Sequence, residues 1–135
     1  MKRARVAYGG AIHDATERAA GLRLADGRVL AEDAFVWLPP FEPGTIVALG
    51  LNYADHVKEL SKELTVTSKD EPLAFLKSPG ALIGHRAQTR RPSDVKFMHY
   101  ECELAVVIGR SAKNVKRADA MRFVAGYTVA NDYAI

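Results

Sequence analysis

Alternating apolar and polar positions at the start of the chain predict short β-strands joined by tight turns. The stretch "RVAYGGAIHDAT" contains two alternating runs around Gly9-Gly10, and "GLRLADGRVLAED" repeats this form around Asp26-Gly27. Both dipeptides are typical of β-hairpin turns, in which residues adopt a positive φ. Residues 1 to 38 are therefore expected to form a small β-hairpin region.

A proline cluster follows this region. Three prolines fall within positions 39 to 43, and proline lacks the backbone donor that a helix or a central strand needs. We interpret the cluster as a linker. It predicts a small N-terminal domain at residues 1–43 and a second domain at residues 44–135.

The rest of the chain combines further strands with short helices. Apolar runs predict strands at residues 45–53, 72–77, 100–109 and 126–135, whereas apolar positions at helical spacing predict helices at residues 54–64 and 115–124. This order of elements predicts an α+β fold in which β-structure dominates.

Composition narrows the class of protein without indicating an activity. The 135 residues are 48% hydrophobic and 26% charged, as expected of a soluble globular protein. A net charge of +3 suits an acidic small molecule, but basic residues are interleaved with acidic ones, which argues against nucleic acid. The single cysteine, Cys102, excludes an internal disulfide and favours a reducing cytoplasm. We find no apolar run that predicts a signal peptide or a membrane span.

Two acidic side chains interrupt the apolar run at residues 97–109, "FMHYECELAVVIG". Successive side chains of a strand point to opposite faces, so Glu101 and Glu103 share one face and lie about 7 Å apart. Two unpaired negative charges on a half-buried surface would repel each other and lose hydration. A solvated edge strand is the simpler explanation, but Ala105 and Val107 continue the same face, which favours a cation between the acids.

Asp132, in the last predicted strand, is a candidate third ligand. Three carboxylates without clustered cysteine or histidine favour a hard cation such as Mg²⁺ or Mn²⁺ over zinc. His99 lies on the same predicted strand face as the glutamates. We expect it to support the ligands or the core rather than to bind the metal.

His56 and Glu59 are three residues apart in the predicted helix at residues 54–64, and so share one helical face. A carboxylate beside an imidazole orients the ring and raises its basicity, as a general base near neutral pH requires. The spacing alone favours an ordinary surface pair on an amphipathic helix.

Four segments together resemble the fumarylacetoacetate hydrolase family: "ALGLNYADHVKEL", "PLAFLKSPGALIG", "MHYECELAVVIG" and "DAMRFVAGYTVANDYAI". The resemblance covers nearly all of the chain from about residue 44 onward. It implies a mixed β-sheet roll, preceded by the small hairpin domain. Members of this family continue with a further long β region, so the resemblance implies that these residues are the N-terminal part of a larger protein and are inactive alone.

The resemblance also implies roles for individual residues. Glu101, Glu103 and Asp132 match the family's metal ligands, for which we expect Mg²⁺, with Mn²⁺ or Ca²⁺ as alternatives. His56 and Glu59 match its catalytic dyad, in a segment that orders as a lid over bound substrate. The resemblance therefore favours catalysis over the surface pair that the spacing alone favours.

The activity implied by the resemblance is decarboxylation and isomerisation of linear 2-oxo or 2-hydroxy-diene dicarboxylic acids in the breakdown of 4-hydroxyphenylacetate (homoprotocatechuate). Both steps pass through an enolate that a metal stabilises. Two alternatives stay open: hydrolysis of a carbon–carbon bond in an acylpyruvate or fumarylacetoacetate-type substrate, and a non-catalytic half of a two-part assembly. We expect a homodimer or pairing with a second copy of the fold, and no nucleic-acid or membrane partner.

Overall fold

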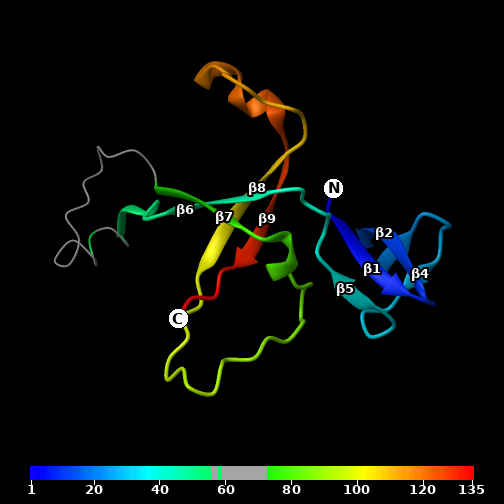
Figure 1. Cartoon of the computed structure of the whole chain (residues 1–135). Coiled ribbons are helices and arrows are strands. Elements are labelled where there is room, and N and C mark those ends of the chain that lie inside the picture. The colour runs from blue at the N-terminus through cyan, green and yellow to red at the C-terminus, as the bar shows by residue number, and fades with distance from the viewer. Residues whose placement is uncertain (56–57, 59–72) are drawn as a thin grey trace. The chain divides into compact units, whose positions relative to one another are not determined.

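Short antiparallel strands dominate the structure, a computed structural model that describes residues 1–55, 58 and 73–135 (Figure 1). The chain forms two compact units, Met1–Gln88 and Thr89–Ile135. The predicted dominance of β-structure is confirmed. In chain order, the elements are β1 (Arg3–Tyr8), β2 (Ala11–Arg18), β3 (Gly21–Leu24), β4 (Val29–Leu30), β5 (Val36–Leu38), β6 (Ile46–Gly50), β7 (Leu73–Lys77), the 3₁₀ helix η1 (Pro79–Ala81), β8 (Cys102–Ile108), the 3₁₀ helix η2 (Arg117–Phe123) and β9 (Val124–Asn131).

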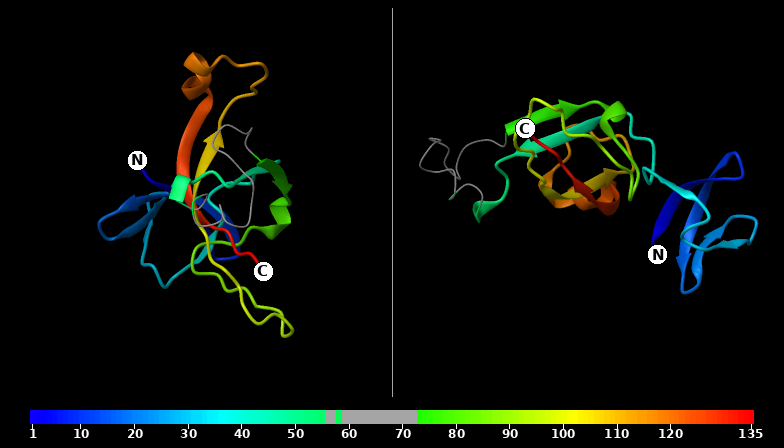
Figure 2. Two further views of the ribbon diagram at one scale, coloured as in Figure 1. Left: turned by 90° about the vertical axis from the view of Figure 1, so that its left-hand side faces the viewer. Right: turned by 90° about the horizontal axis from the view of Figure 1, so that it is seen from below.

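The first five strands form one antiparallel sheet in the order β4-β3-β2-β1-β5, shown from two further sides in Figure 2. Gly9 and Gly10 turn the chain between β1 and β2 with φ angles of 57° and 77°, and Gly27 has a φ of 91° between β3 and β4. Glycine adopts these conformations without a steric penalty. Both hairpins predicted from the sequence are confirmed.

The hydrophobic core of the described residues lies on this sheet and its loops. Burying a large apolar side chain stabilises a fold by about 1.5–3 kcal/mol, so these residues give the sheet its stability. The buried hydrophobic residues are Val6, Ala15, Leu22, Leu24, Leu30 and Phe35.

An ion pair fixes the turn between β3 and β4. The Nε and Nη2 atoms of Arg28 donate to Oδ2 of Asp26 at 2.8 and 2.6 Å, and the Arg28 backbone N–H donates to Oδ1 at 3.0 Å. The guanidinium carbon also lies 5.3 Å from the ring centre of Tyr8. The side-chain hydrogen bond from Arg28 lowers the pKa of Asp26 below its ordinary value. The turn is thus tied to a second strand, β1.

A turn at residues 84–87, called the clasp turn below, lies directly against β5. The N–H of Ala87 donates to the carbonyl of Gly84 at 3.1 Å. A Cβ added to Gly84 would lie 2.0 Å from the carbonyl oxygen of Trp37, so only glycine permits this approach. The ring of His85 meets the Trp37 ring edge-on, with centroids 5.2 Å apart. The clasp turn therefore fastens the connection after β7 to the N-terminal sheet.

The later strands form two separate antiparallel pairs, β6 with β7 and β8 with β9. The helix predicted at residues 115–124 is present as η2, a seven-residue 3₁₀ helix. It has no side-chain cap hydrogen bond and no buried residue, so no packing supports regular α-helical turns. Of the helix predicted at residues 54–64, Ala54, Asp55 and Lys58 are helical, and the others lie outside the described residues.

The described residues contain no helix with the length and apolar character needed to cross a membrane.

The domain boundary predicted after residue 43 falls in the stretch between β5 and β6. It stays a prediction.

The ion pair of Asp26 and Arg28 makes stability depend on pH. Because the pKa of Asp26 is lower in the folded chain, its contribution is present above the unfolded pKa of about 3.9 and is lost as pH falls through the folded value. We expect Asp26→Asn to lower the melting temperature at about pH 7, and the effect to diminish as the pH falls below the unfolded pKa. Thermal unfolding across this range measures the difference. Asp33→Asn, at an exposed acid of the same unit, is the control, and an equal effect of both variants would contradict the prediction.

The clasp turn predicts a large effect of adding one methyl group. We expect Gly84→Ala to push the turn away from Trp37 and to destabilise the chain by about 1–3 kcal/mol, as overpacking does. Trp37 is the single tryptophan of the sequence, so its fluorescence emission reports on this contact directly. Gly44→Ala is the matched control, because a Cβ there meets no atom within 4 Å. Unchanged emission in the Gly84 variant would show that the turn does not depend on this approach.

Candidate metal centre

The pairing of β8 with β9 positions the three acids. Its register places Glu103 opposite Ala130. Pairing continues beyond the strand ends, where the N–H of Asp132 donates to the carbonyl of Glu101 at 2.8 Å. Glu101 and Asp132 are therefore cross-strand partners, although Glu101 precedes β8 by one residue and does not lie within it as predicted.

Backbone pairing continues on both sides of Asp132. His99 and Ala134 exchange two backbone hydrogen bonds, with N···O distances of 2.8 and 3.2 Å. Asn131, on the other side of Asp132, is the last residue of β9. Asp132 is thus held against the segment that carries Glu101.

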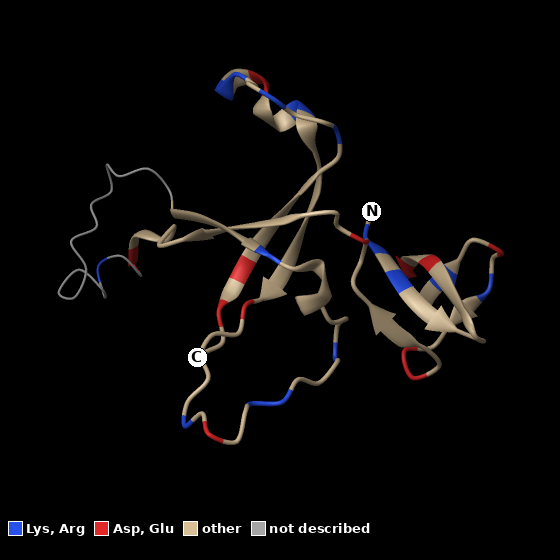
Figure 3. Cartoon of the chain, in the orientation of Figure 1, with Lys and Arg blue, Asp and Glu red and all other residues tan. Residues whose placement is uncertain are grey.

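The three acids share one face of this strand pair. Cross-strand partners project from the same face of a sheet, and so do residues two apart along one strand. Glu101, Glu103 and Asp132 meet these conditions, and all three are half-buried. Figure 3 shows acidic positions where β8 begins and just after β9 ends. The structure thus brings together the acids that the sequence singled out, and their role as ligands stays a prediction.

The residues present fit a hard cation in chemistry and in backbone spacing. Carboxylate oxygens are the ligands that Mg²⁺ and Ca²⁺ prefer. Directly opposed residues have Cβ atoms about 5 Å apart, a separation that the flexible stem of a glutamate can cover. In the conformations present, no three His, Cys, Asp or Glu side chains of the described residues form a metal-binding group. Convergence on one ion therefore requires the acidic side chains to rotate.

The opposite face of β8 is largely exposed. Leu104, Val106 and Ile108 are 60%, 49% and 59% exposed. Cys102, on the same face, is also exposed. A sheet of two strands buries little of either face, which explains this exposure.

Asn131 is a residue of this site that sequence reasoning missed. Its side-chain oxygen, Oδ1, accepts a hydrogen bond from the backbone N–H of Glu101 at 3.2 Å. The available signal was the Asn-Asp pair at the end of the apolar run. The sequence does not show that the amide of Asn131 reaches the neighbouring segment.

The predicted catalytic pair, His56 and Glu59, lies outside the described residues. Lys58, between them in sequence, is described and pairs with Asp55 at 3.5 Å. The role of His56 and Glu59 stays a prediction.

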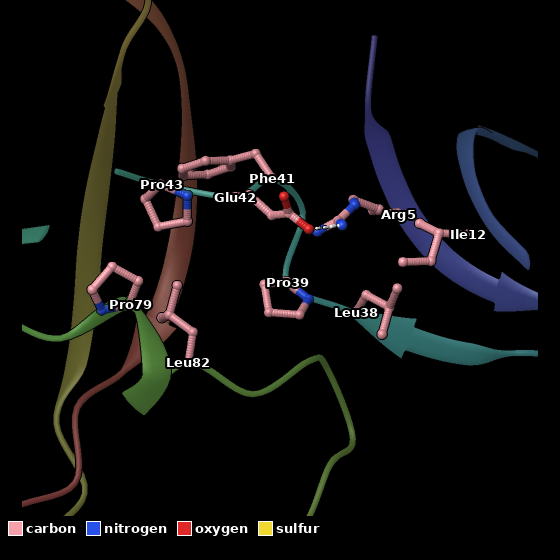
Figure 4. Close-up of a pocket in the computed structure, with 9 residues that line it drawn as sticks. All are labelled: Arg5, Ile12, Leu38, Pro39, Phe41, Glu42, Pro43, Pro79 and Leu82. Carbon is pink, nitrogen blue, oxygen red and sulfur yellow. Dashed lines mark hydrogen bonds and ion pairs between the residues drawn. The ribbon is translucent and has the colours of Figure 1, made fainter. Parts of the chain in front are cut away.

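A pocket of about 300 Å³ in the unit Met1–Gln88 is an alternative place for a ligand (Figure 4). Proline and aliphatic side chains form most of its lining. Its two charged residues, Arg5 and Glu42, form an ion pair with each other. The pocket includes none of the predicted site residues and offers a ligand mainly apolar surface, so we do not assign chemistry to it.

The fold and the acidic face define the class of protein: a domain dominated by antiparallel strands that gathers carboxylates on one strand pair. Residues 45–135 match the family model described as "Fumarylacetoacetate (FAA) hydrolase C-terminal". The chain belongs to the fumarylacetoacetate hydrolase family, as the resemblance of its four segments implied.

Curated relatives are similar to most of the chain. A 4-hydroxyphenylacetate degradation bifunctional isomerase/decarboxylase from Salmonella dublin is 49% identical over 123 residues, which cover 87% of this chain and 28% of the relative. A homoprotocatechuate catabolism bifunctional isomerase/decarboxylase from Escherichia coli is 55% identical over 96 residues, covering 71% of this chain and 22% of the relative. The chain thus spans about a quarter of the length of these relatives.

Solved structures share the fold along nearly the whole chain. The 5-carboxymethyl-2-hydroxymuconate delta-isomerase of Mycobacterium smegmatis is similar with a TM-score of 0.79 and 31% identity. The 2-hydroxyhepta-2,4-diene-1,7-dioate isomerase of Mycobacterium marinum gives a TM-score of 0.74 and 25% identity. Each comparison covers 98% of this chain and 54% of the solved chain. These likenesses confirm the predicted fold class.

Proposed function

We propose that the protein isomerises and decarboxylates linear 2-oxo or 2-hydroxy-diene dicarboxylic acids formed in the breakdown of 4-hydroxyphenylacetate. One observation carries the proposal. Glu101, Glu103 and Asp132 lie on one half-buried face, in a chain 49% identical over 123 residues to an isomerase/decarboxylase of 4-hydroxyphenylacetate degradation.

The proposed role of the three acids is to hold a divalent cation, Mg²⁺ with Mn²⁺ or Ca²⁺ as alternatives. A cation held there would draw electron density from the 2-oxo group of the substrate and so stabilise a developing negative charge. The three acids would hold that cation at a fixed place on the chain. Their half-buried position strengthens these charge interactions, because the effective dielectric constant is lower than in bulk water.

The proposed role of His56 is proton transfer. Loss of CO₂ leaves an electron pair on carbon that must be protonated, and a double-bond shift removes a proton from one carbon and returns it to another. One imidazole would serve both reactions, by accepting and then donating the proton. In this proposal, Glu59 orients the imidazole.

The proposal includes an acidic substrate, a homodimer and a cytoplasmic location. The net charge of +3 supports the first of these, since it favours approach of an anion. The single cysteine supports the third, because it indicates no need for an oxidising compartment.

Removing the charge of either glutamate tests the metal site. We expect Glu101→Gln and Glu103→Gln to abolish Mg²⁺ binding, because each removes the charge of one proposed ligand. The fold should be retained, because each change relieves repulsion between neighbouring acids. Calorimetric titration of the longest natural form of the protein measures binding. Asp94→Asn, at an exposed acid of the same unit, is the control. Parent-like affinity in both glutamine variants would contradict the assignment.

Replacing the proposed proton carrier tests the reaction. We expect His56→Ala to keep Mg²⁺ affinity and to lower turnover by about a hundredfold or more, the usual contribution of a positioned acid or base. The assay uses the longest natural form, with the diene-dioate and with an acylpyruvate. Turnover within a few-fold of the parent across the pH profile would assign His56 to an ordinary surface pair. Turnover of the acylpyruvate alone would favour the hydrolytic alternative.

A further inference from the structure

The backbone pairing becomes irregular where two of the acids meet. Hydrogen-bonded pairs recur at every second residue of an antiparallel ladder. His99 and Ala134 exchange two hydrogen bonds, so the next hydrogen-bonded pair toward β8 and β9 is Glu101 with Asp132. The N–H of Asp132 donates to the carbonyl of Glu101 at 2.8 Å, as a regular ladder requires. The N–H of Glu101, which a regular ladder directs to the Asp132 carbonyl, donates to Oδ1 of Asn131 at 3.2 Å.

Two adjacent residues therefore hold the backbone of Glu101 on both sides. The side chain of Asn131 accepts its N–H, and the backbone of Asp132 donates to its carbonyl. A residue whose donor and acceptor are both engaged cannot rotate about the strand axis without losing one of these bonds. The direction of the Glu101 side chain relative to Asp132 is thus set by a side-chain amide instead of a ladder bond.

We propose that Asn131 is a positioning residue, which fixes Glu101 relative to Asp132 and thereby raises the affinity of the acidic face for a divalent cation. This inference rests on the proposed function, in which both acids bind the cation.

Asn131 acts through Glu101 and not as a ligand. It pairs with Cys102 in the register, and that pair projects from the face opposite the acids. Both Asn131 and Cys102 are exposed there.

Two substitutions of similar size separate the hydrogen bond from the bulk of the side chain. Asn131→Leu removes the acceptor, whereas Asn131→Asp keeps an oxygen at the same position. We expect the Mn²⁺ affinity measured by calorimetry to fall about 10- to 100-fold in the leucine variant, as for other residues that orient metal ligands, and to be retained in the aspartate variant. Cys102→Ala, at the position opposite Asn131, is the control and should leave affinity unchanged.

A second measurement is made on the metal-free protein. Hydrogen exchange of the Glu101 N–H should become faster in Asn131→Leu and stay parent-like in Asn131→Asp, because only the former lacks an acceptor. Both measurements use the longest natural form of the protein. Asn131→Ala replaces the leucine variant if the latter does not fold.

The outcomes separate this inference from the proposed function. Faster exchange with unchanged Mn²⁺ affinity in Asn131→Leu overturns the positioning role, and so does unchanged exchange. Loss of affinity in Asn131→Asp with parent-like exchange also overturns it. If Glu101→Gln and Glu103→Gln both retain parent-like Mn²⁺ affinity, the proposed metal site fails, whatever the Asn131 variants show.

Discussion

The register between β8 and β9 is the constraint on which the candidate site depends. Side chains alternate between the faces of a strand, so a shift of one residue would place Asp132 on the face opposite Glu101 and Glu103. The hydrogen bond from Asp132 to Glu101 and the two between His99 and Ala134 maintain this register past the end of β9. Backbone pairing, more than burial, places the acids.

Burial alternates along the strand pair, and the acids lie on its more buried face. Along β8 the half-buried positions are Glu103, Ala105 and Val107, and the exposed positions include Leu104 and Ile108. Carboxylates ordinarily lie in water. Partial burial of a carboxylate is unfavourable unless a positive charge or hydrogen bonds compensate it. In the proposed function, a bound cation would supply such compensation.

The features predicted correctly from the sequence are those with a local cause. Gly9-Gly10 and Asp26-Gly27 specify turns by their own backbone preferences, and the two-residue period of a strand places Glu101 and Glu103 together. The clasp turn was not predicted, because the fit of Gly84 against Trp37 joins segments far apart in the sequence. The hydrogen bond from Glu101 to Asn131 was missed for the same reason, since it crosses between strands.

The two interactions around Glu101 differ in their dependence on the cation. In the proposed metal site, repulsion among Glu101, Glu103 and Asp132 would oppose their approach, and a bound cation would relieve it. The hydrogen bond from the Glu101 backbone N–H to the Asn131 side-chain oxygen involves no net charge and does not require a cation as a partner. In the proposed site this bond would order the backbone before binding, which would lower the entropy that binding must remove. Because the backbone already places all three acids on one face, side-chain rotation is the ordering that a cation would still have to impose.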